Sequence, residues 1–288
     1  MGKIMHFHQI IAQFIFAVAL TGAVELKSEP VTLNLWSDDY HGIIRDAGAE
    51  KKFPKLPDTV ANVSIPAMTV YLPEKRKSIG IALVYCSGGS YNKVSYVSDY
   101  VSQADYFVSK GVAVIVVKYR TLPPSKNVSD AMDDGLRAVR IVRYRAKEWG
   151  INPAKIGMLG GSAGANLILN AATHWDNGKA GTADPVERVS SRPDFIVLLC
   201  PWPNKQLLSD FVINETTPPA LLCSAHDDKI APTAFADGIV AAYKKAGVPA
   251  TLWTIEKGGH TAFKPGNFGG GWKEQLWSWL ENIGIIAK

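Results

Sequence analysis

The sequence is poor in cysteine. It has three cysteines, which is both too few and an odd number for the disulfide framework of many small exported domains. Cys86, Cys200 and Cys223 each end an apolar run, and a free cysteine in such a place behaves as a small apolar residue. We therefore expect three buried free thiols, with a Cys200–Cys223 bridge as the alternative.

The sequence also lacks a block of like charge. It has 31 Lys and Arg against 26 Asp and Glu, a formal net charge of +5, and the excess is spread along the chain. Proteins that bind nucleic acids usually carry a basic cluster or stripe, so the composition argues against a nucleic-acid partner. With 47% apolar and 20% charged residues, the chain is too apolar to stay disordered and too mixed for a membrane bundle.

The apolar run near the amino terminus is too short to span a bilayer. The uncharged segment 10–23 has fourteen residues, whereas a spanning helix needs about 20. It follows a basic start and ends in small residues, which is typical of a cleavable secretory signal. We predict a signal peptide over 1–23, cut after Ala23 or Ala19. This leaves 24–288 as a single domain that is secreted or periplasmic and free of the membrane. An uncleaved anchor or a buried first helix is the alternative.

Runs that are apolar throughout alternate with segments of helical spacing in the rest of the chain. Such runs suit strands that are covered on both faces, and the alternation predicts an α/β fold with a mostly parallel sheet and helices on both faces. Two earlier runs, 31–36 and 67–72, are expected to add antiparallel edge strands and so to complete a sheet of about eight strands. The rest of 24–65 is a polar, proline-punctuated entry. The six main runs are 79–86, 112–118, 155–159, 195–200, 220–224 and 250–255.

The clearest helix is predicted over 130–149, with Ser129 or Asp130 able to cap it, because their side-chain oxygens accept from unpaired first-turn N–H groups. Its apolar residues recur on one face, and three arginines fall away from that face. The apolar residues are Met132, Leu136, Val139 and Val142, and the arginines are Arg137, Arg140 and Arg143.

Two connections, 176–194 and 201–218, are long for a compact fold. Loops of this length are often functional. They could wall a pocket or be solvated surface, and the sequence leaves both interpretations open.

The strongest chemical motif is G-x-S-x-G at 160–164, where a short apolar strand runs directly into a helix. This strand–turn–helix context is the one in which the motif exposes a nucleophilic serine. Gly160 and Gly164 remove side chains that would collide with neighbouring backbone in so tight a turn. The sequence therefore predicts that Ser162 is a nucleophile held above the edge of the sheet.

A serine hydroxyl needs a neighbouring base to take its proton. In this architecture the acid and then the histidine follow the nucleophile along the chain. Three histidines follow Ser162. His174 lies at the far end of the helix that Ser162 opens, and His226 directly follows a strand where the acid is expected. His260 follows the run 250–255, so we predict that it is the base.

Two neighbouring aspartates compete for the role of the acid. Adjacent side chains diverge, so only one of Asp227 and Asp228 can point at the imidazole. We favour Asp228, four residues before Pro232, where the next helix is about to begin. Its task is to orient His260 and stabilise its charged form. No matching ligands lie near this His-Asp-Asp cluster, so we expect no metal.

An acyl-transfer site also needs hydrogen-bond donors for the oxyanion. One donor should be the N–H of Ala163. The others should come from the loop after the first inner strand, where small residues let backbone N–H groups approach, and we nominate Gly89 and Ser90.

With these pieces in place, the chain resembles the α/β-hydrolase superfamily and, within it, the secreted acetylxylan-esterase and feruloyl-esterase-like group. The resemblance implies the α/β-hydrolase fold, a triad of Ser162, Asp228 and His260, and activity on ester bonds, often acetyl groups on polysaccharides. The stretches that carry it are LNLW at 33–36, MTVYLP at 68–73, YCSGGSYNKVS at 85–95, VVKYRTLPP at 116–124, DDGLRAVRIVRYRAKEWGINPAKIG at 133–157, GGSAG at 160–164, SRPDFIVLLCPW at 191–202, DDKIAP at 227–232, AGVPATLW at 246–253 and KGGH at 257–260.

The chain departs from the family pattern at three places. Ser87 and Ser90 replace the proline and last glycine of the usual P-G-G-G-Y loop, and Gly161 replaces the bulky residue that usually precedes the nucleophile. If position 90 needs a positive φ, Ser90 is strained there.

The sequence thus predicts a serine carboxylic-ester hydrolase that needs no cofactor and acts on a small ester or an acylated polysaccharide. The alternatives are a serine peptidase of the oligopeptidase type and a non-catalytic binding protein on a hydrolase scaffold. Tyr91, Trp202 and Phe263 lie on loops that could line the acyl or sugar pocket, although a core or loop-packing role fits each of them as well.

Overall fold

The computed structural model describes residues 29–37, 49–54, 56–95, 98–121, 128–264, 267 and 269–287. The predicted signal peptide, 1–23, lies outside these residues. Among the helices that the structure describes, none is long and apolar enough to cross a membrane.

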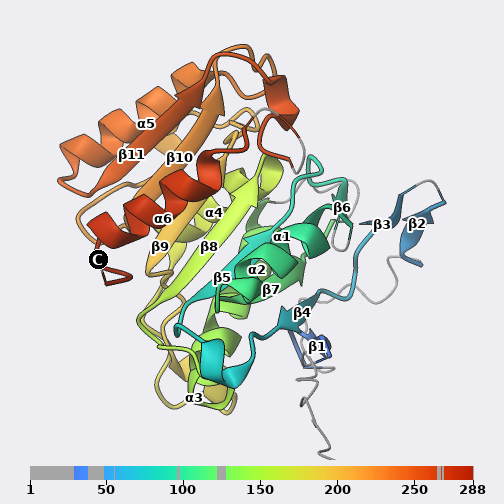
Figure 1. Cartoon of the computed structure of the whole chain (residues 1–288). Helices are drawn as coiled ribbons and strands as arrows, with labels where there is room; N and C mark the ends of the chain where they lie inside the picture. The colour runs from blue at the N-terminus through green and yellow to red at the C-terminus, as the bar shows by residue number, and fades with distance from the viewer. Residues whose placement is uncertain are drawn as a thin grey trace, which may run out of the picture.

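An eight-stranded, mostly parallel sheet forms the centre of the molecule (Figure 1). Its first two strands run antiparallel to their neighbours and the other six are parallel, as predicted. In spatial order the strands are β1 (Val31–Asn34), β4 (Ala67–Tyr71), β7 (Ala113–Lys118), β5 (Ala82–Cys86), β8 (Ile156–Gly161), β9 (Phe195–Leu199), β10 (Ala220–Ala225) and β11 (Ala250–Ile255). All eight coincide with the apolar runs of the sequence.

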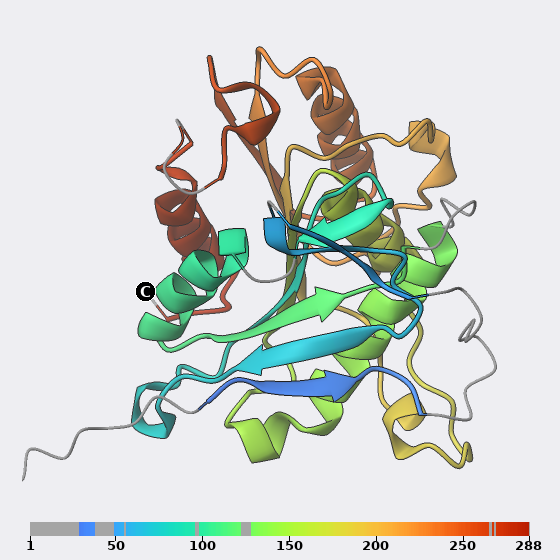
Figure 2. The same ribbon diagram turned by 90° about the vertical axis from the view of Figure 1, so that its right-hand side faces the viewer.

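Helices cover both faces of this sheet, as Figure 2 shows. Successive residues of a strand point to opposite faces. Along β5, accordingly, Ala82, Val84 and Cys86 join one core cluster, while Leu83 and Tyr85 join the other. The first core is covered by α2 (Val128–Tyr144), α4 (Ala163–His174) and α5 (Thr233–Lys245), and the second by α1 (Ser98–Ser109) and α6 (Trp272–Asn282). The remaining helices are the one-turn α3 (Ala146–Trp149) and four short 3-10 turns, η1 (Lys75–Lys77), η2 (Pro185–Arg188), η3 (Leu208–Asp210) and η4 (Gly259–Thr261).

A second, three-stranded antiparallel sheet stands out from the main one (Figure 1). It consists of β2 (Lys51–Phe53), β3 (Leu56–Ala61) and β6 (Lys93–Ser95). No strand was predicted at β2 or β3, which lie in the polar, proline-punctuated entry. These strands are short, and β3 pairs with β6, more than thirty residues away, as the hydrogen bond between Thr59 Oγ1 and Ser95 Oγ (3.0 Å) illustrates.

Helix α2 begins at Val128, so Ser129 and Asp130 lie in its first turn and are not the N-cap, contrary to the prediction. Among its arginines, which the sequence places away from the apolar face, Arg137 and Arg140 are buried. Each is neutralised by acidic residues of the 176–194 connection. The ion pairs are Arg137–Asp184 (2.6 Å), Arg137–Glu187 (2.6 Å), Arg140–Asp176 (2.6 Å) and Arg143–Asp194 (3.1 Å).

The two long connections lie at different places. The 176–194 connection joins the end of α4 to the start of β9, so it lies at the amino edge of the sheet. The 201–218 connection leaves the carboxyl end of β9 and returns to the start of β10. Asp176 and Asn177 of the first connection and Val212, Asn214, Thr216 and Thr217 of the second line one cavity.

All three cysteines are free and buried, as predicted, and no Cys200–Cys223 bridge forms.

Candidate active site

Ser162 occupies a sharp turn between β8 and α4. Its backbone has φ 56° and ψ −121°, a strained conformation for a residue with a side chain. A Cβ on Gly160 or Gly164 would collide with the carbonyl oxygen of Cys86, because β5 and β8 pair with Cys86 opposite Gly160. The Ser162 N–H donates to the Leu199 carbonyl at 2.9 Å. Neighbouring strands on both sides therefore hold the turn in place.

The structure brings Ser162, His260 and Asp228 into one hydrogen-bonded chain. His260, in η4 after β11, lies with Nε2 at 2.8 Å from Ser162 Oγ and with Nδ1 at 2.8 Å from Asp228 Oδ2. The Asp228 side chain is buried, and its Oδ1 accepts the N–H groups of Ile230 (2.8 Å) and Ala231 (2.9 Å). These bonds fix the carboxylate so that only Oδ2 faces the imidazole.

The neighbouring Asp227 points elsewhere, as expected of adjacent side chains. Its carboxylate accepts the N–H groups of Gly259 (2.7 Å) and Gly258 (3.1 Å). These two bonds, that of Gly259 first, lower the pKa of Asp227 below its usual value. The structure thus brings Asp228 to His260 and uses Asp227 to tie down the backbone that carries His260.

The other two histidines after Ser162 lie apart from this chain. His174 ends α4, with Nδ1 at 2.9 Å from the Asn170 carbonyl oxygen. His226 is exposed, and its backbone N–H donates to the Ile255 carbonyl at 2.9 Å.

The loop after β5 lies beside Ser162. A Cβ on Gly88 would come within 3.1 Å of the Ser162 Cβ. Ser90 has φ 54° and Tyr91 has φ 58°, so position 90 does require the positive φ at which a serine is strained. The Gly89 carbonyl accepts the N–H groups of Asn92 and Lys93 and closes the turn. In the described part of the chain, no acceptor is hydrogen-bonded to the N–H of Ala163, Gly89 or Ser90.

The three aromatic residues expected near a pocket are mostly packed inside. Tyr91 and Phe263 are buried and Trp202 is half-buried. The Tyr91 ring lies 6.5 Å from that of Trp202, and the Phe263 ring lies 6.0 Å from that of Trp253. For Tyr91 and Phe263 the structure therefore shows the loop-packing alternative.

A buried amide network that the sequence analysis missed ties the loop after β5 to α4. The Tyr91 hydroxyl donates to Asn166 Oδ1 at 2.7 Å, and Asn166 Nδ2 donates to Gln206 Oε1 at 2.9 Å. Gln206 Nε2 then donates to Asn170 Oδ1 at 3.1 Å. Two asparagines at i, i+4 in an otherwise apolar helix were the available signal, because a buried amide needs a partner.

Cys200 lies against the same chain of side chains. Its Sγ, a carboxylate oxygen of Asp228 and a ring nitrogen of His260 all lie within 4.8 Å of one another. Such donors could bind Zn²⁺, but both ring nitrogens of His260 already contact Ser162 and Asp228. Burial and then the negative charge of Asp228 raise the pKa of the Cys200 thiol. The thiol therefore stays protonated beside the carboxylate.

Comparisons with known proteins agree with this architecture. A family model described as the α/β hydrolase fold matches residues 83–217. The chain is 28% identical to an acetylxylan esterase of Xylanibacter ruminicola, over 75% of this chain and 48% of that protein. It is 23% identical to an endo-1,4-beta-xylanase B of Butyrivibrio fibrisolvens, over 68% of this chain and 34% of that protein. The chain thus spans about half or less of the curated relatives that it matches.

Solved structures show the same fold. An acetyl ester-xyloside bifunctional hydrolase from Caldicellulosiruptor lactoaceticus matches with a TM-score of 0.74 and 28% identity, over 89% of this chain and 97% of that one. An esterase of the Planctomycetes species Thermogutta terrifontis matches with a TM-score of 0.65 and 24% identity, over 84% and 94% of the two chains. The predicted fold class is thereby confirmed.

Proposed function

We propose that the chain, which has the α/β-hydrolase fold and resembles esterases, is a serine carboxylic-ester hydrolase that removes acetyl groups from an acylated polysaccharide. The observation that carries the proposal is the unbroken hydrogen-bonded chain from Ser162 through His260 to Asp228, with 2.8 Å at each step. This is the arrangement of nucleophile, base and orienting acid that acyl transfer requires.

In the first half of the reaction, Ser162 Oγ attacks the ester carbonyl carbon while its proton passes to His260 Nε2. The carbon–oxygen bond to the sugar then breaks, and His260 returns the proton to the leaving sugar oxygen. In the second half, water attacks the acetyl-serine and gives one proton to His260, which passes it to Ser162 Oγ as the bond from this oxygen to the acyl carbon breaks. Acetic acid leaves and ionises in solvent. Asp228 stabilises the imidazolium at each transfer. Each proton transfer at the reacting bonds passes through His260, so the chemistry needs no cofactor.

The negative oxygen of each tetrahedral intermediate needs donors that are already in place. The N–H groups of Ala163, Gly89 and Ser90 have no other acceptor within the described residues. Ala163 is also the first residue of α4, where the helix dipole favours negative charge. These three amides are therefore the proposed oxyanion hole.

The substrate class rests on the relatives. Both curated relatives and the bifunctional hydrolase carry names that refer to xylan or xylosides, and a polymer substrate requires the enzyme outside the cytoplasm. We therefore propose that the protein is secreted or periplasmic, which agrees with the signal peptide predicted over 1–23.

Acetate release from acetylated xylan, measured beside a chain-length series of p-nitrophenyl esters, tests the proposal. The wild-type protein should release acetate and should prefer the acetyl ester. Ser162→Ala should lower turnover by about 10⁶-fold, as loss of the nucleophile does in a comparable triad. Asp228→Asn should lower it by about 10⁴-fold.

His226→Ala is the matched control, because His226 is an exposed histidine outside the hydrogen-bonded chain. It should keep wild-type turnover. A Ser162→Ala protein that keeps most of its activity on p-nitrophenyl acetate would rule out the mechanism. Turnover of p-nitrophenyl acetate without acetate release from xylan would rule out the substrate class alone.

A further inference from the structure

A cavity of about 360 Å³ opens at the end of α4 that is remote from Ser162. A helix rises about 1.5 Å per residue, so the 12 residues of α4 place the cavity roughly 18 Å from the nucleophile. The cavity is formed where the two long connections meet. It is lined by Ala172, Thr173, Trp175, Asp176, Asn177, Val212, Asn214, Thr216 and Thr217.

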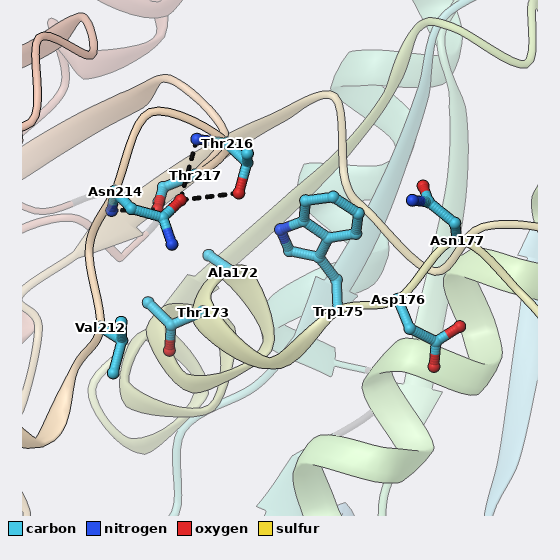
Figure 3. A pocket seen from close by; sticks show the side chains of 9 residues that line it. All are labelled: Ala172, Thr173, Trp175, Asp176, Asn177, Val212, Asn214, Thr216 and Thr217. Carbon is cyan, nitrogen blue, oxygen red and sulfur yellow. Dashed lines mark hydrogen bonds between the residues drawn. The ribbon is translucent and has the colours of Figure 1, made fainter.

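Trp175 is the centre of this cavity (Figure 3). Its indole is half-exposed and lies between Asn177 on one side and the segment from Asn214 to Thr217 on the other. The guanidinium of Arg192 lies 5.5 Å from the ring centroid, and its Nε donates to the Thr216 carbonyl at 2.9 Å. Arg192 thus joins the two walls, so the ring is held in place before any ligand binds.

The polar groups around the indole offer hydrogen bonds and no free carboxylate. Both carboxylate oxygens of Asp176 are already used, one by Arg140 (2.6 Å) and one by the N–H of Gly178 (2.6 Å). The cation against the ring, Arg192, donates to the backbone carbonyls of Thr216 and Pro193. Within the described residues, the indole N–H of Trp175, the side-chain amide of Asn177 and the Nδ2 of Asn214 have no partner. An apolar ring with hydrogen-bond donors and acceptors around it and no free carboxylate suits an uncharged ligand with many hydroxyl groups.

We propose that this cavity is a second, non-catalytic binding site for one sugar ring of the polysaccharide that Ser162 deacetylates. The identity of the polymer rests on the proposed function. The C–H face of the sugar would pack on Trp175, and its hydroxyl groups would bond to Asn177 and Asn214. The volume is at the small end of the roughly 300–1,000 Å³ of ligand sites, which limits the site to one ring. The site would hold the polymer on the enzyme between reactions.

Binding to xylan and turnover of p-nitrophenyl acetate, measured on the same proteins, test this site. Binding is measured by affinity electrophoresis in gels that contain acetylated xylan or the same xylan after alkaline deacetylation. Trp175→Ala should weaken binding to both forms by about tenfold, because it removes an apolar face and a hydrogen bond. Asn177→Ala should weaken it by about threefold, because one exposed hydrogen bond is lost. Both variants should keep wild-type turnover of p-nitrophenyl acetate.

Trp149→Ala is the matched control, since Trp149 also lies under an arginine, with Arg145 at 5.6 Å, and is outside the cavity. It should bind xylan as the wild type does, and so should Ser162→Ala. Wild-type binding by both Trp175→Ala and Asn177→Ala would overturn the proposed site. Failure of the wild type to bind either xylan, with normal p-nitrophenyl acetate turnover, would also overturn it and leave the esterase proposal standing. Binding that depends on Trp175 in a protein with no esterase activity would support the site and contradict the proposed function.

Discussion

Two adjacent carboxylates at the end of β10 have different tasks. Asp228 is buried and faces His260, while Asp227 is exposed and accepts the two N–H groups just before His260. The first holds the imidazole and the second holds the backbone that presents it. Both contributions depend on negative charge, but replacing Asp227 leaves Asp228 in place as the partner of His260.

Asp227 should make stability depend on pH in the acid range. Its pKa is lower in the folded protein, because the amides of Gly259 and Gly258 stabilise the carboxylate. A group of this kind stabilises the fold above its unfolded pKa, about 3.9 for Asp, and that contribution is lost as pH falls through the lower folded value. We expect the free energy of unfolding to fall less steeply below about pH 4 in Asp227→Asn than in the wild type. Urea unfolding at a series of pH values measures this, and parallel curves for the two proteins would contradict it.

Tyr91 should act as a positioning residue for the oxyanion loop. Burial raises the pKa of its hydroxyl, so the hydroxyl stays protonated and donates to Asn166. Tyr91→Phe removes that bond while keeping the ring, and it leaves a strained loop less firmly held. We expect kcat to fall about tenfold with KM nearly unchanged, because a less firmly held loop stabilises the transition state less and binds the substrate as before.

The control for this variant is Tyr144→Phe, since Tyr144 is an exposed tyrosine at the end of α2. It should leave both constants unchanged. A rise in KM with constant kcat for Tyr91→Phe would instead assign Tyr91 to substrate binding.

At the scale of single residues, the sequence predicted that Ser162 and His260 would meet, because the motif and the chain order are local patterns. It favoured Asp228 over Asp227 as the partner of His260 but did not decide between them, since only the turn conformation determines which carboxylate reaches the imidazole. It missed the amide network of Asn166 and Gln206, because those residues lie 40 positions apart and only the packed structure brings them together.

Among the elements, α2 has two buried polar sides. One side carries the arginines that pair with the 176–194 connection, and the other carries Asp134. The Asp134 carboxylate accepts hydrogen bonds from Arg120 and from the indole of Trp36 at 2.7 Å. Burial raises the pKa of Asp134 to about 6, although Arg120 opposes the rise.

Asp134→Asn should therefore destabilise the protein strongly. It would leave the buried Arg120 without its main counter-charge, and breaking a buried pair on one side costs about 3–5 kcal/mol. The double variant Asp134→Leu with Arg120→Met should be closer to the wild type, because it removes both charges. Urea unfolding compares the three proteins, and a loss within about 0.5 kcal/mol for Asp134→Asn, the range of neutral surface changes, would refute the expectation.

Helices and strands were predicted well where a strand is apolar throughout. The prediction was poorer where a strand or a buried polar residue depends on a partner far away in the sequence. The runs that became β5, β7 and β8 need no partner to be recognised. The sequence placed the arginines of α2 away from the apolar face but did not show that two of them are buried, because the acids that neutralise them are 36 to 51 positions away. The small sheet was missed because its strands are short and β3 finds its partner β6 more than thirty residues along the chain.

For the whole molecule, three strands present the functional groups at one edge. Ser162 follows β8, Asp228 follows β10, and His260 follows β11. Pairing of these strands in the parallel sheet therefore also brings the three side chains together. This arrangement could be anticipated from chain order. The second cavity could not, because it forms between the ends of two loops whose course the sequence does not define.

The assembled site should work without a metal ion. Cys200, Asp228 and His260 offer donors within 4.8 Å, but the proposed mechanism needs both nitrogens of His260 for proton transfer and orientation. We expect protein dialysed against EDTA to keep its full turnover of p-nitrophenyl acetate. Loss of activity on dialysis that is restored by Zn²⁺ would contradict the proposed mechanism.

Positive φ angles at residues other than glycine gather around this edge. Six of the seven such residues in the described chain are Ser90, Tyr91, Ser162, Cys200, Asn204 and Lys205, each a conformation that costs of order 1–3 kcal/mol. We therefore expect mild heating to inactivate the protein at a temperature at which its secondary structure is still intact. Residual activity after brief heating would then fall several degrees before the far-ultraviolet circular dichroism changes, and coincident transitions would show that the whole molecule melts as one unit.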